Sequence, residues 1–66
     1  MAFLEGDIVK LKDAGDGSEI GRLCSIQEGG YWVYFAGAGC LYVPLNSLEH
    51  ASGDAPQCPG DCPPDN

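Results

Sequence analysis

Four cysteines and one histidine are the residues of this chain that could bind a metal or form crosslinks. Cys58 and Cys62 stand close together in a segment rich in Pro and Gly, and with His50 they could supply three metal ligands. A structural zinc site takes four ligands, usually from two such cysteine pairs, so we expect no metal. The same two cysteines could instead close a labile disulfide. Because no feature indicates an oxidising compartment, we expect mainly free thiols, with Cys24 and Cys40 as small buried side chains.

Catalytic and cation sites are not indicated by the remaining polar residues. A single histidine gives no Ser-His-Asp or Cys-His arrangement. The carboxylates of Asp13 and Asp16 lack the dense alternating acids and the final glutamate of a calcium loop. We therefore expect a protein that is not an enzyme, with no catalytic residue and no cofactor.

The charge balance narrows the class of partner. The chain has 66 residues, and three Lys and Arg against ten Asp and Glu give a net charge of −7. Such a surface is expected neither to neutralise nucleic-acid phosphates nor to bind anionic lipid. The first residues lack the basic start and apolar run of a signal peptide, and no stretch is long enough to span a membrane. We expect a cytoplasmic protein that binds neither nucleic acid nor membrane.

Short apolar runs bounded by Gly, Asp or Pro predict strands rather than helices. The runs lie at residues 7–12, 19–27, 31–35, 40–43 and 48–50. The second run does not alternate strictly, which predicts a β-bulge near Gly21 or Cys24. Pro44 to Leu48 suit a short 3₁₀ turn before the last strand. This pattern predicts an all-β fold, a small five-stranded SH3-like barrel.

The composition changes after His50. Residues 51–66 contain four of the five prolines and no aliphatic residue larger than Ala. Such a segment buries too little apolar surface to offset the entropy of ordering its backbone. We predict a barrel domain at 1–50 and a disordered, flexible tail at 51–66, whose deletion should leave thermal stability nearly unchanged.

One set of glycines, apolar and acidic residues spans most of residues 3–50: Phe3, Gly6, Asp7, Val9, Gly21, Gly30, Tyr31, Val33, Pro44, Leu48 and Glu49. This pattern resembles bacterial SH3-like modules and, in spacing, the plasmid- and integron-borne type II dihydrofolate reductases. The resemblance implies a mobile-element or phage accessory protein. It also implies the alternative function, an oligomeric ligand-binding protein or enzyme with a pore formed by symmetry.

The sequence departs from that reductase family at the residues that bind ligand. The family binds folate and NADPH through a Val-Gln-Ile-Tyr segment and a lysine on the first strand. In this chain Leu41 takes the place of the glutamine and Leu11 that of the lysine. A pore without these donors in a protein of charge −7 is expected to repel both anionic ligands.

The strand at 31–35 is the most informative element for function, because strand geometry must expose one of its faces. If Tyr31, Val33 and Phe35 face the core, then Trp32 and Tyr34 face outward; the opposite orientation is the alternative. The candidate interaction face consists of Trp32, Tyr34, Ile8 and Tyr42. Exposed aromatic side chains are typical of interface centres. We expect a non-catalytic interaction module that either binds a protein partner or self-associates as a homo-oligomer, and its acidic surface favours a basic partner.

Overall fold

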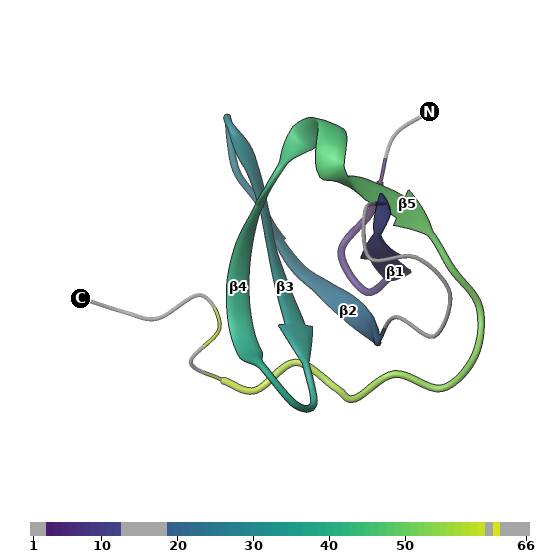
Figure 1. The fold of residues 1–66 in the computed structure, drawn as a ribbon. Helices are drawn as coiled ribbons and strands as arrows, with labels where there is room; N and C mark the ends of the chain where they lie inside the picture. The colour runs from purple at the N-terminus through teal and green to yellow at the C-terminus, as the bar shows by residue number, and fades with distance from the viewer. Residues whose placement is uncertain (1–2, 13–18, 61, 63–66) are drawn as a thin grey trace.

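The computed structural model describes residues 3–12, 19–60 and 62, and the described chain is all-β (Figure 1). The elements are β1 (Ile8–Leu11), β2 (Ile20–Ile26), β3 (Gly30–Phe35), β4 (Gly39–Pro44), the 3₁₀ helix η2 (Leu45–Ser47) and β5 (Leu48–His50). The five strands form one antiparallel sheet in the order β4-β3-β2-β1-β5. The prediction of an all-β chain with five strands and a 3₁₀ turn before the last strand is confirmed.

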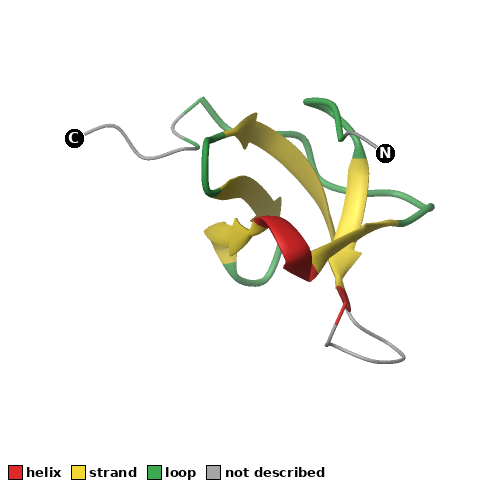
Figure 2. Ribbon diagram, turned by 90° about the horizontal axis from the view of Figure 1, so that it is seen from above, coloured by secondary structure: helices red, strands yellow, loops and turns green. Residues whose placement is uncertain are grey.

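The sheet curves around its apolar side, as the view from above shows (Figure 2). Among the described strands β4 pairs only with β3, and β5 pairs only with β1. The sheet therefore has two edges and is not closed by hydrogen bonds between β4 and β5. Closure into a barrel, which the sequence predicted, stays a prediction.

One apolar cluster lies on the concave side, which we call the inner face. Its buried members are Val9, Leu23, Val33, Phe35, Val43 and Leu48, one or two from each strand, and Phe3, Leu11 and Tyr31 pack against it. Alternation along each strand places every second side chain on this face. The other side of the sheet is the outer face.

The β-bulge predicted in the second strand is present. The register between β2 and β3 shifts between Leu23 and Ser25, so Cys24 is the extra residue. Gly21, the other predicted position, pairs regularly with Phe35. The bulge explains why the apolar residues of this run do not alternate strictly.

The predictions for the cysteines were wrong. The structure contains the disulfides Cys24–Cys58 and Cys40–Cys62, with Cα atoms 5.8 Å apart in each, so the four residues are neither thiols nor metal ligands. The local Cys58–Cys62 disulfide does not form either. Each tail cysteine bonds instead to a strand cysteine.

These crosslinks also correct the prediction of a flexible tail for residues 51–60 and 62. The Ala51 amide donates to the Ile8 carbonyl at 2.9 Å, which continues the pairing of β5 with β1. Beyond it the chain crosses the sheet toward β4 (Figure 1). The composition of the tail indicates correctly that it has little apolar surface to bury, but covalent bonds order it without that surface.

Two findings bear on the remaining predictions from sequence. Asp13 and Asp16, together with the rest of the loop at 13–18, lie outside the described residues. No helix among the described residues is long and apolar enough to cross a membrane.

Candidate interaction surface

The orientation of β3 is the first of the two alternatives that the sequence allowed. Val33 and Phe35 are buried on the inner face and Tyr31 packs against the core. Trp32 and Tyr34, which alternate with them, therefore lie on the outer face and are half-buried. The structure thus places both predicted aromatic residues on the outer face of the sheet.

Trp32 and Tyr42 form an aromatic pair across β3 and β4. The two residues are directly opposite in register, and their ring centroids are 5.4 Å apart with the planes tilted by 57°. Tyr42 remains 48% exposed. Tilted pairs at this separation are a favourable geometry for aromatic rings. We call Trp32 and Tyr42 the aromatic pair.

Gly30 makes room for the ring of Tyr42. A Cβ atom at Gly30 would lie 2.9 Å from Tyr42 Cζ and would collide with the carbonyl oxygen of Val43. The ring of Tyr42 therefore covers the backbone at the start of β3, on the side that faces away from the core. Because Gly30 has no side chain, the ring of Tyr42 can lie directly on the backbone of Gly30, on the outer face of the sheet.

Ile8 and Tyr34 lie in the neighbouring row of the outer face. Arg22 pairs with Ile8 on one side and with Tyr34 on the other, and Tyr34 pairs with Cys40. The row therefore runs Ile8, Arg22, Tyr34, Cys40 across four strands. Ile8 is two strands away from Tyr34, so the predicted set of four residues does not form one apolar patch.

Arg22 is a structurally important residue that the sequence analysis missed. Its Nε donates to the Pro56 carbonyl at 3.0 Å, its Nη2 to the Ala55 carbonyl at 3.2 Å, and its Nη1 to the Gly6 carbonyl at 3.0 Å. The side chain thus joins the tail to the N-terminal turn. The sequence feature that could have indicated this role is the position of Arg22, a single arginine within an otherwise largely apolar run.

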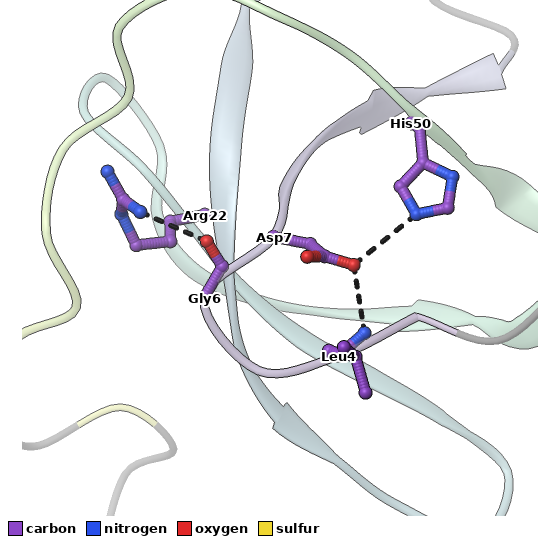
Figure 3. Close-up of polar contacts among 5 residues, drawn as sticks. All are labelled: Leu4, Gly6, Asp7, Arg22 and His50. Carbon is purple, nitrogen blue, oxygen red and sulfur yellow. Dashed lines mark hydrogen bonds and ion pairs between the residues drawn. The ribbon is translucent and has the colours of Figure 1, made fainter.

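A second polar cluster lies beside Arg22, in the turn from Leu4 to Asp7 (Figure 3). Asp7 Oδ2 accepts from the Leu4 amide at 2.9 Å and lies 3.3 Å from His50 Nε2. Gly6 has a φ of 96°, which favours glycine in this turn. The contacts tie the turn to β5, and Phe3 stacks on the imidazole with centroids 4.3 Å apart. The cluster fixes the N-terminal segment on the sheet.

A metal centre is not formed by the part of the chain that the structure describes. No group of three or more His, Cys, Asp and Glu side chains gathers among those residues. His50 contacts Asp7 and Phe3, and Cys58 and Cys62 are held by two different strands.

The outer edge of β4 adjoins the aromatic pair. β4 is an edge strand, so its second side carries backbone groups that no described strand pairs with. Leu41 and Tyr42 on this strand are 38% and 48% exposed, and Leu45 in the following 3₁₀ helix is 44% exposed. An edge strand with exposed apolar side chains can pair with a further strand. The aromatic pair and the edge of β4 together form the candidate interaction surface.

Comparison of this chain with protein-family models, with curated protein sequences and with solved structures finds no match.

Proposed function

We propose that this protein is a small acidic protein-interaction module, built as an SH3-like barrel, that binds an extended basic segment of a partner protein. The strand order and the 3₁₀ helix before β5 support the SH3-like assignment. The binding surface is the aromatic pair together with the edge of β4. The observation that carries the proposal is the tilted pair formed by half-buried Trp32 and exposed Tyr42, the latter on the edge strand β4.

An extended peptide fits this surface because an edge strand offers main-chain donors and acceptors at strand spacing. Adding a strand to a sheet edge gives affinity through backbone hydrogen bonds, while side chains in the neighbouring positions give specificity. Pro44, the last residue of β4, has no amide hydrogen, which limits the pairing to the preceding residues.

Charge favours a basic partner over a second copy of the chain. The protein carries a net charge of −7, so two copies repel each other, whereas a Lys- or Arg-containing segment is attracted. Two of the described basic side chains already have partners within the molecule. Arg22 donates to three backbone carbonyls, and Lys10 Nζ lies 3.5 Å from Glu49 Oε2. Guanidinium and ammonium groups also bind the faces of Trp and Tyr rings, which the aromatic pair provides.

A labelled peptide tests this proposal. The probe is a dye-labelled peptide of alternating Arg and Val, long enough to pair with β4, and its control replaces every Arg with Glu. We expect the fluorescence anisotropy of the Arg peptide to rise with protein concentration, and to rise less at high salt because the charges are screened. The Glu peptide should not bind.

Two variants locate the surface. Trp32→Ala and Tyr42→Ala should each weaken binding by about 30-fold, which corresponds to about 2 kcal/mol. Leu4→Ala is the matched control, because Leu4 is 66% exposed but lies in the N-terminal turn, outside β3 and β4. Equal affinity of all three variants for the Arg peptide would contradict the proposed surface.

The oligomeric state separates this proposal from self-association. We expect size-exclusion chromatography with light scattering to give the mass of one chain. A monomer excludes any site built by symmetry, because such a site needs several copies of the chain. A stable dimer that Trp32→Ala dissociates would instead assign the aromatic pair to contact between copies.

A further inference from the structure

The tail follows the outer face of the sheet, and its attachment points fall in a regular order. We call residues 53–60 together with Cys62 the strap. Its first part follows β2, whose outward residues Ile20, Arg22 and Cys24 meet it in turn. The strap then ends on β4, at Cys40.

The first attachment point is a close approach between backbone and side chain. Gly53 has a φ of 124°, and a Cβ atom there would lie 3.0 Å from Ile20 Cδ1. Both features favour glycine at this position. The strap therefore lies directly on the outward side chain of Ile20.

The two disulfides then carry the strap across β3. Cys24 lies on β2 and Cys40 on β4, and β3 lies between these strands in the sheet. Tyr34 pairs with Cys40 and occupies the outer face between the two crosslinks. The two crosslinks thus attach the strap to the outer face on either side of β3, in the region of Tyr34 and next to the aromatic pair.

Covalent bonds supply most of what holds the strap. It contains no apolar side chain larger than Pro or Cys. Besides the disulfides, its described side-chain hydrogen bonds are the two from Arg22 to carbonyl oxygens. Two hydrogen bonds contribute little compared with the entropy of ordering the strap residues. Cleavage of both disulfides should therefore release the strap from the sheet.

We infer that the strap is a redox-released cover of the outer face: the intact disulfides hold it over the Tyr34 region, and their reduction by a dithiol extends the binding surface from the aromatic pair to Tyr34. The inference rests on the proposed function, because it concerns the same surface. In each reduction the S–S bond takes up two electrons and two protons and gives two thiols. The dithiol loses the same electrons and protons and closes its own disulfide.

Peptide affinity in the two redox states tests the inference. The probe is the dye-labelled Arg-Val peptide, and the protein is the full chain, oxidised or treated with dithiothreitol. We expect reduction to raise the affinity by about five-fold or more. Tyr34→Ala should remove this gain while leaving the affinity of the oxidised protein nearly unchanged.

A second variant addresses the case in which the fully reduced chain unfolds. Cys40→Ser with Cys62→Ser keeps the Cys24–Cys58 crosslink but frees the part of the strap that crosses β3. This double variant should bind the peptide more tightly than the oxidised parent while circular dichroism shows a folded sheet. Unchanged affinity of the folded double variant would overturn the inference.

Hydrogen exchange distinguishes failure of the inference from failure of the proposed function. Without any peptide, reduction should speed amide exchange in residues 53–60, and the double substitution should speed it at Gly60, beyond the retained Cys24–Cys58 crosslink, while β2 and β3 stay protected. Faster strap exchange with no peptide binding in either state would reject the proposed function but leave strap release standing. Unchanged strap exchange would overturn strap release, whatever the peptide does.

Discussion

Single residues decide how closely the parts of this sheet approach each other. Gly21 is buried in β2, and a Cβ atom there would lie 2.7 Å from the Tyr34 carbonyl oxygen and 2.8 Å from Phe35 Cδ1. The first neighbour is backbone and the second belongs to a core ring, so neither can move aside cheaply. Gly21 is thus required for the close packing of β2 on β3.

We predict that Gly21→Ala lowers the free energy of unfolding by about 1–3 kcal/mol, because the added methyl group overpacks the core. Urea denaturation followed by circular dichroism measures this change. Gly60→Ala is the matched control, since nothing lies within 4 Å of a Cβ atom at Gly60 and its φ is not in the left-handed region. If the two variants are equally stable, the contact at Gly21 does not limit packing.

At the scale of elements, the local sequence pattern predicted where the strands lie, but it did not predict which face of β3 is buried or which cysteines pair. The run from Tyr31 to Phe35 is aromatic and β-branched, so it formed β3 as expected, and the irregular second run contained the predicted bulge. The alternation left two orientations open, and the packing of the core selected the one that buries Val33. Pairing of Cys24 and Cys40 with the tail depends on contacts between distant segments, which no local pattern contains.

The orientation of β3 predicts different effects for neighbouring substitutions. Leu23 is fully buried opposite Val33, so Leu23→Ala should lower the free energy of unfolding by about 2–5 kcal/mol. Trp32 is half-buried on the outer face, so Trp32→Ala should cost less stability than Leu23→Ala. Parallel urea titrations compare the two variants. A larger loss for Trp32→Ala would place Trp32 in the core rather than on an interaction surface.

At the scale of the whole molecule, net charge bears on the alternative function, that of a reductase with a pore formed by symmetry. Leu41 is exposed on β4 and Leu11 packs against the core, so both positions present apolar groups where the resembling reductases use polar ones. A charge of −7 further disfavours an anionic cofactor.

We therefore predict no measurable binding of NADPH and no NADPH-dependent reduction of dihydrofolate. Titration calorimetry with NADPH, at a protein concentration that would reveal micromolar affinity, measures the binding. The loss of NADPH absorbance over time, in the presence of dihydrofolate, measures the reduction. Micromolar binding would restore the alternative function of an oligomer with a ligand pore.

The small size of the chain makes the two disulfides important for stability as a whole. A 66-residue domain buries a modest core, and chains of this size commonly depend on crosslinks. The crosslinks here join residues 34 and 22 positions apart in the sequence, so each closes a long loop in the unfolded chain. The cytoplasmic location, which was expected from the lack of a signal peptide, stays a prediction; the two disulfides count against it, because such bonds persist mainly in oxidising compartments.

We predict that replacing Cys58 and Cys62 with Ser lowers the free energy of unfolding by about 2–4 kcal/mol for each lost crosslink, since the unfolded chain regains its loop entropy. Deletion of residues 51–66 should have a similar effect, in contrast to the small change expected from tail composition alone. Urea denaturation of the oxidised parent, the double variant and the truncated chain measures these losses. A truncated chain as stable as the oxidised parent would mean that the sheet does not depend on its crosslinked tail. The mass of the alkylated parent, with and without prior reduction, provides the control that both disulfides were closed.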